Sequence, residues 1–235
     1  MENICDYCQH DLCIKRVPVF APLEINVLEE IVPYVMRRNY ARGSLIVHEG
    51  DLLTSLYIIN KGSVKAFKTS LQGKEQILYV FAEGDFFGES YLFNNEESGY
   101  SIEALEEVQI CTLEKSHFQN FLLANPEVAL KIIEELGRRI NLLEINIQSM
   151  GVRSVDTRVA ALLLEYLEKF SFDDATGPII QLPLSREGMA NSLGIARETL
   201  SRKLTALEQQ GYIQSVGNKA LRVIDKSYLE KMAGR

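Results

Sequence analysis

Cysteine is the residue type whose spacing in this chain most directly suggests chemistry. Three of the four cysteines, Cys5, Cys8 and Cys13, form a C-x2-C-x4-C pattern near the N-terminus, and the fourth is Cys111. In a reducing compartment such a group is more often a metal or redox site than a structural disulfide. Four thiolates suit an iron–sulfur cluster or tetrahedral zinc. His10 lies among the cysteines and is a further potential ligand.

Polar side chains that can read nucleic acid occupy one face of a helix that we expect from about Ala196 to Gln210. At about 100° per residue, three leucines fall on one stripe of this helix. The side chains on another face, all within the first two turns, are Arg197, Glu198, Ser201 and Arg202. Arginine can bind guanine O6 and N7 in a bidentate way, and glutamate can accept from cytosine N4. A solvated charged face is the alternative interpretation.

The elements around this helix predict how it is held. Ser185 can cap a short preceding helix, and Gly194 allows a tight turn between the two helices, which is the helix-turn-helix pattern. Two short alternating segments follow within 211–224, and the Gly217-Asn218 turn between them predicts a hairpin, the wing of a winged helix. The side chains that we expect at the DNA backbone are Ser185, Lys203, Lys219 and Arg222.

The string Arg197-Glu198-Thr199-Leu200-Ser201-Arg202 resembles the recognition helix of the Crp/Fnr family of bacterial transcription regulators. Its Glu-x-x-Ser-Arg part is similar to the Fnr branch, and its Arg-Glu-x-x-x-Arg part to the Crp branch. In the Fnr branch a distant cysteine completes a cluster with three N-terminal ones, and Cys111 stands at that point. The resemblance therefore implies an oxygen-labile 4Fe–4S cluster on Cys5, Cys8, Cys13 and Cys111. Zinc, a thiol–disulfide switch such as Cys5 with Cys111, and inert thiols without a cofactor remain the alternatives.

Short strands separated by turn glycines run to about Leu113, which predicts an antiparallel β-roll or jelly roll. Their order resembles the cyclic-nucleotide-binding β-roll of the same family. Gly88-Glu89 matches the start of that family's phosphate cassette. However, Ser98 stands where the cassette has its phosphate-binding arginine, and Glu103 adds negative charge nearby. A phosphodiester without this arginine loses its bidentate partner, so we expect no cyclic nucleotide to bind.

A long helix is predicted after Pro126, from Glu127 to about Met150. Its apolar residues step alternately by four and three positions, which is the heptad seam of a coiled coil between two copies. The seam residues are Ile133, Leu136, Ile140, Leu143, Ile147 and Met150. An amphipathic helix packed on its own roll is the alternative. We favour the dimer because a two-fold DNA site needs a two-fold protein.

The net charge of −7 is unevenly distributed along the chain. Residues 1–150 contain 13 Lys and Arg against 22 Asp and Glu, whereas residues 151–235 contain 12 against 10. The acidic part repels nucleic acid and the basic face attracts it. No apolar run is long enough for a transmembrane helix, and the N-terminus does not resemble a signal peptide, so we expect a cytoplasmic protein.

These patterns predict an α+β fold in three parts. The parts are a sensor domain over 1–125 with the cysteine segment and the β-roll, a dimerisation helix over 126–151 and a winged helix-turn-helix domain over 152–235. Smaller elements are expected as a helix over 23–35, a hinge over 151–156, a helix over 157–170, a loop over 173–178 and a last helix over 225–232.

The predicted function is that of a homodimeric, sequence-specific DNA-binding transcription regulator. The expected partners are a DNA palindrome with TGA-containing half-sites and RNA polymerase, without a membrane. A thiol oxidoreductase is the rival class, because of Cys5-x-x-Cys8, but this pair does not open a helix in a βαβ unit. The motifs HExxH and GxSxG and the P-loop are absent, so we expect no enzymatic activity.

Overall fold

The computed structural model describes residues 17, 20, 21, 23–89, 96–152, 154–174 and 177–234. The predicted ligands Cys5, Cys8 and Cys13 therefore lie outside the described residues. Contacts divide the chain into two compact units. One takes in the described residues up to Lys68 together with Leu78–Asn141, and the other Thr69–Ile77 together with the chain from Leu142 onward. Both units contain helices and antiparallel sheets, which confirms the α+β class.

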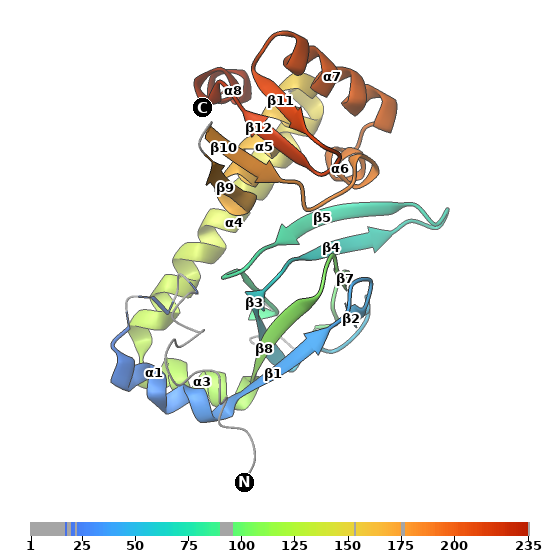
Figure 1. Ribbon diagram of the computed structural model, residues 1–235. Helices are drawn as coiled ribbons and strands as arrows, with labels where there is room; N and C mark the ends of the chain where they lie inside the picture. Colours follow the sequence, from blue (N-terminus) through green and yellow to red (C-terminus); the bar gives the residue numbers. More distant parts are fainter. Residues whose placement is uncertain are drawn as a thin grey trace. The chain divides into compact units, whose positions relative to one another are not determined.

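Eight strands among the described residues form the roll that the strand-and-glycine pattern predicts. They are arranged in two antiparallel sheets, with the orders β1-β8-β3-β6 and β2-β7-β4-β5 (Figure 1). Gly62 shows why glycine is needed between strands, since its φ is +84° and an added Cβ would lie 2.7 Å from the carbonyl oxygen of Glu107. The strands are β1 (Val35–Tyr40), β2 (Leu45–Val47), β3 (Ser55–Lys61), β4 (Val64–Thr69), β5 (Glu75–Phe81), β6 (Phe86–Phe87), β7 (Ser101–Ala104) and β8 (Val108–Glu114).

Helices lie beside the roll at one end of β1 and β8 (Figure 1). The predicted helix over 23–35 ends early, because Pro33 lacks an N–H to donate and β1 already begins at Val35. Helix α3 was not predicted from the sequence, although it buries Phe118, Phe121 and Leu122. The long helix α4 agrees with its prediction. These elements are α1 (Ile25–Ile31), the 3-10 helix η3 (Val32–Tyr34), α3 (Lys115–Ala124) and α4 (Pro126–Val152).

Successive side chains of β8 point to opposite faces of its sheet, and both faces are buried. Val108 and Ile110 of β8 belong to the core inside the roll. Cys111 and Leu113 belong to a second core, which also contains residues of α1, α3 and the first turns of α4. We call this second group the outer core. It joins the outside of the sheet to the helices.

The second unit contains a winged helix-turn-helix, as predicted. Its sheet has the strand order β11-β12-β10-β9, and α6 and α7 form the paired helices (Figure 1). Its elements are α5 (Val155–Phe170), β9 (Ser171–Asp174), β10 (Gly177–Gln181), α6 (Arg186–Leu193), α7 (Arg197–Gln209), β11 (Ile213–Val216), β12 (Ala220–Val223) and α8 (Lys226–Ala233).

The predicted loop over 173–178 is wrong, because this stretch contributes to two paired strands. Asp173 of β9 lies opposite Pro178 of β10. The missing N–H of Pro178 is tolerated because β12 pairs with β10 only from Ile179 onward. Local composition rich in turn residues suggested a loop, whereas the sheet supplies partners that composition does not reveal.

The predicted hinge over 151–156 is shorter than expected. Helix α4 continues to Val152 and α5 begins at Val155. Ser154 caps α5, since its Oγ accepts a hydrogen bond from the amide of Thr157 at 3.2 Å.

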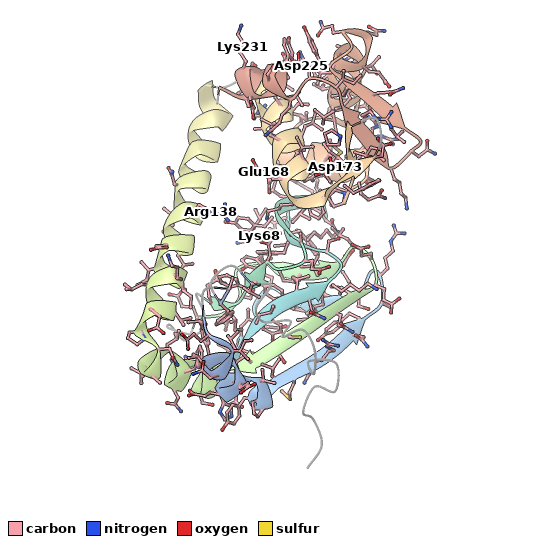
Figure 2. All side chains as sticks on the ribbon, turned by 60° about the vertical axis from the view of Figure 1, so that its left-hand side comes forward. Lys68, Arg138, Glu168, Asp173, Asp225 and Lys231 are labelled. Atoms are coloured by element: carbon pink, nitrogen blue, oxygen red, sulfur yellow. The ribbon has the colours of Figure 1, made fainter. Side chains whose placement is uncertain are left out.

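Helix α8 closes the described chain and has favourable charges at both ends (Figure 2). The Oδ1 of Asp225 accepts from the amide of Tyr228 at 2.9 Å and so caps the N-terminus. Lys231 lies in the last turn, where a cation suits the helix dipole. Hydrogen bonds from Ser227 and from the Tyr228 amide lower the pKa of Asp225, so the cap is charged at neutral pH.

Candidate nucleic-acid interface and cysteine site

The turn between α6 and α7 has the geometry that Ser185 and Gly194 predict. Ser185 Oγ accepts from the amide of Gly188 at 3.1 Å and caps α6. Gly194 ends α6 in the left-handed region with φ +62°. The amide of Ile195 then donates back to the carbonyl of Ala190 at 3.0 Å, which closes the turn. The second helix is thereby aimed by a defined backbone conformation.

Helix α7 separates its side chains by face. Leu200, Leu204 and Leu207 are buried against the rest of the unit. On the other face the side chains available to a ligand are the exposed Arg197, Glu198 and Arg202 and the half-buried Ser201. The structure therefore brings the four predicted base-reading residues together on one accessible face, in the first two turns of the helix.

The four residues predicted at the DNA backbone differ in their exposure and in their partners within the protein. Ser185 is exposed, and its cap uses an acceptor lone pair, so its O–H can still donate. Lys219 is exposed in the turn between β11 and β12. Lys203 Nζ lies 2.7 Å from Asp156 Oδ2. Arg222 Nη2 lies 2.7 Å from Asp174 Oδ2, so two of the three cations in this set are already paired within the protein.

Cys111 is 1% exposed and lies in the middle of the sheet, with a strand on each side. It is directly opposite Arg37 of β1 and Ile58 of β3. Directly opposite residues of antiparallel strands point to the same face. Cys111 therefore faces the outer core rather than the interior of the roll, beside a half-buried arginine.

Residues that follow the N-terminal cysteines pack on this same face. Val17 and Phe20 are completely buried members of the outer core that contains Cys111. The ring of Phe20 meets Phe118 edge-on, with centroids 6.4 Å apart, and Phe121 at the same distance. Within the described part of the chain no group of three or more metal-binding side chains is present, and the other three cysteines lie outside it.

Two family models match the chain. Residues 37–125 match the cyclic nucleotide-binding domain, and residues 157–232 match the Crp-like helix-turn-helix domain. The chain is 29% identical over 220 residues to the cyclic AMP receptor protein of Thermus thermophilus, covering 94% of this chain and 98% of that protein. It is 28% identical over 223 residues to the nitrogen fixation regulation protein FixK of Bradyrhizobium diazoefficiens, covering 95% and 92%.

The chain is a DNA-binding transcription regulator of the Crp/Fnr type. The solved structure of FixK2 from Bradyrhizobium japonicum shares its fold, with a TM-score of 0.75 at 23% identity over 84% of this chain and 96% of that one. These relatives are regulators and not enzymes. No helix among the described residues of this regulator is long and apolar enough to cross a membrane.

In this regulator the interior of the roll is lined by aromatic rings. Tyr57 stacks on Phe87 with centroids 4.8 Å apart, and Phe81 packs on the same ring at 5.5 Å. Ser98, which the sequence resemblance predicts at the position of a phosphate-binding arginine, is 2% exposed and donates its hydroxyl to the carbonyl of Tyr100 at 2.7 Å. The Ser98 side chain is thus neutral, buried and hydrogen-bonded within the protein.

Helix α4 of the regulator has an apolar stripe that its own roll does not cover. Ile133 is 63% exposed and Ile140 57%. Leu136, predicted in the same seam, is half-buried against the outer core. Leu130, which was not predicted, is 62% exposed and extends the stripe. The side chains of Leu143, Ile147 and Met150 lie outside the described set, although their backbone is helical.

Proposed function

We propose that this regulator senses oxygen or redox state through a 4Fe–4S cluster bound by Cys5, Cys8, Cys13 and Cys111. The main support is that Cys111 faces the outer core, where Val17 and Phe20 are also buried. Cys13 precedes Val17 by four residues. Four residues span at most about 14 Å, so the chain can bring the N-terminal thiols to the face of Cys111. The four cysteines are the only ones in the sequence, and their thiolates suit iron–sulfur chemistry.

The outer core supports a route from these thiolates to the dimer helix. Phe20 contacts Phe118 and Phe121 of α3. Val128 and Ile132 of α4 are buried in the same core. Ligation would hold the N-terminal segment on the sheet, and loss of ligation would remove that constraint from the helices. A bound cluster would supply the oxygen-labile chemistry at these four thiolates. The residues of the outer core would transmit the loss of the cluster to α4, because Val128 and Ile132 of α4 are buried among them.

We also propose that two copies join along α4 and bind a DNA palindrome with TGA-containing half-sites. The exposed stripe of Leu130, Ile133 and Ile140 supports the pairing, because apolar residues at three- and four-residue steps form coiled-coil seams. The exposed reading face of α7 supports the contact with base edges. RNA polymerase is the expected protein partner of such a regulator. The roll is proposed to act without a cyclic nucleotide, since Ser98 supplies no cation.

Metal analysis of protein purified without oxygen tests the sensor. The parent should contain iron and sulfide in equal amounts, and Cys111→Ala should lose both while keeping its circular dichroism spectrum. Thr112→Ser, a change at the next residue of β8, is the matched control and should retain iron. Stoichiometric zinc without iron would instead support the zinc alternative. An intact Cys5–Cys111 disulfide in metal-free protein, seen by peptide mapping, would support the thiol switch.

A further inference from the structure

The first turn of α5 contacts both helices of the helix-turn-helix. Asp156 Oδ2 lies 2.7 Å from Lys203 Nζ on α7. Arg158 Nη1 donates to the carbonyl of Leu193, the last residue of α6, at 2.6 Å. Two residues of the first turn of α5 therefore contact α6 and α7, the two helices of the helix-turn-helix.

The bond to Leu193 lies at the end of α6, where helix carbonyls lose their partners. The amides of Gly194 and Ile195 satisfy the carbonyls of Asn191 and Ala190. The carbonyl of Leu193 receives the guanidinium of Arg158 instead. A cation at a helix C-terminus is also favoured by the helix dipole. Arg158 thus holds the turn beside the left-handed Gly194 against α5.

The pair of Asp156 and Lys203 holds the second helix. The side chains of Lys203 and Asp156 are 36% and 45% exposed, so solvent screens the pair and its contribution to stability is small. The pair nevertheless restricts α7 at the residue that follows Arg202, and Arg202 is one of the predicted base-reading residues. The two contacts constrain orientation more than they add stability.

We infer that Asp156 and Arg158 are positioning residues for DNA reading. We call the contacts Asp156–Lys203 and Arg158–Leu193 the α5 clamp. It fixes the angle of α6 and α7 on α5, and so aims the reading side chains of α7. The clamp rests on the DNA-binding role of α7 but not on the cysteine site or on any particular half-site sequence. It assigns Lys203 to orientation rather than to a phosphate.

The test compares variants of the full-length protein, with a control that matches the charge of Asp156→Asn. Asp156→Asn removes one carboxylate from the clamp. Glu230→Gln removes a carboxylate of similar exposure from the Lys226–Glu230 pair on α8, 3.2 Å long, and is the control. Arg158→Met removes the bond to Leu193, and Arg158→Lys keeps its charge. Two duplexes serve as probes, one that the parent selects from a random pool, whatever its sequence, and one scrambled version of it.

The clamp predicts loss of affinity for the selected duplex only. Arg158→Met should weaken it about tenfold, as expected for a hydrogen bond from a charged group, and Arg158→Lys should recover part of the loss. Asp156→Asn should weaken it about threefold, as expected for a half-exposed ion pair. Affinity for the scrambled duplex should not fall in any variant, and Glu230→Gln should match the parent.

Stronger DNA binding by the Asp156→Asn variant would contradict the clamp. If Asp156 merely neutralises a phosphate-binding Lys203, its removal strengthens binding to both duplexes and steepens the salt dependence by about one counterion. If the parent selects no duplex at all, the proposed reading function fails, and amide hydrogen exchange still tests the clamp. Exchange at Gly194 and Ile195 should be faster in Arg158→Met than in Glu230→Gln, and equal rates contradict the clamp.

Discussion

Ile132 and Ile133 are neighbours on α4 but face opposite environments: Ile132 is 2% exposed and Ile133 is 63% exposed. Ile132 packs in the outer core with Cys111. Ile133 lies on the uncovered stripe. One helix therefore presents one side to the proposed sensor site and the other side to solvent, where a second copy can pack. Any rotation of α4 about its axis would change both surfaces together.

Ile133→Glu is expected to dissociate the dimer, because it places a charge in an apolar seam that a second helix would desolvate. Sedimentation equilibrium of the metal-free parent should give twice 26.6 kDa, and the variant should give the monomer mass. Leu123→Glu is the control, since Leu123 is 83% exposed on α3 and lies off the stripe. A monomeric parent, or a dimeric Ile133→Glu protein, would show that this stripe is not the dimer contact.

The position of the exposed apolar stripe on α4 shows what the spacing of apolar residues can and cannot predict. The heptad pattern correctly predicted a long helix with an apolar face. It could not separate the side that packs on the roll from the side that stays exposed, because α4 is apolar on both. The predicted seam therefore included Leu136, which packs partly against the outer core, and did not include the exposed Leu130. Only the contacts of Leu136 with residues distant in sequence resolve the two sides.

Local signals predicted the DNA-binding unit well. Ser185, Gly194 and Gly217 each define a cap or turn within a few residues, and the structure has all three. Helix α3 was missed because Glu114 gives it no side-chain cap and no charge pattern marks its start. The pairing of Arg222 with Asp174 joins residues 48 apart, so no local pattern could reveal it.

Phe20→Ala is expected to destabilise the roll by about 3–5 kcal/mol, as for other fully buried phenylalanines. Phe20 is completely buried and contacts Phe118 and Phe121. Urea titration of the metal-free protein measures the change, and Phe20→Leu should cost less because it keeps most of the apolar volume. If Phe20 also couples the cysteine site to α4, the alanine variant should retain iron while oxygen no longer alters its DNA affinity. An unchanged oxygen response would remove Phe20 from the route.

Tyr166→Phe is expected to leave the free energy of unfolding unchanged or to raise it by up to about 1 kcal/mol. Tyr166 is 1% exposed, and its hydroxyl has no hydrogen-bond partner among the described residues. Burial raises the pKa of this hydroxyl far above its ordinary value, so it stays neutral. Tyr166→Ala, which also removes the ring that meets Phe170, should cost about 3–5 kcal/mol. A loss above about 1 kcal/mol in the phenylalanine variant would reveal a partner for the hydroxyl, such as a buried water.

Arg202→Ala and Lys219→Ala should weaken DNA binding in two distinguishable ways. Arg202 is exposed on the reading face of α7, one helical turn after Glu198, so the two can address adjacent base pairs. Glu198 would accept from cytosine N4 opposite guanine, and Arg202 would bind a guanine in the TGA core. Arg202→Ala should therefore cost about 1–3 kcal/mol at that guanine and relax the preference there. Arg197 and Ser201 would tune the outer bases, between TTGAT and TGTGA.

Lys219 lies in the exposed turn of the wing, where it would meet phosphate rather than a base. Lys219→Ala should weaken all duplexes alike and reduce the salt slope by about one, while leaving the selected motif intact. Selection from random duplexes with the parent and both variants measures these effects, and half-sites centred about 34 Å apart are expected. If the parent selects no two-fold TGA motif, or if Arg202→Ala selects the same motif with undiminished preference, then other side chains of α7 read the DNA.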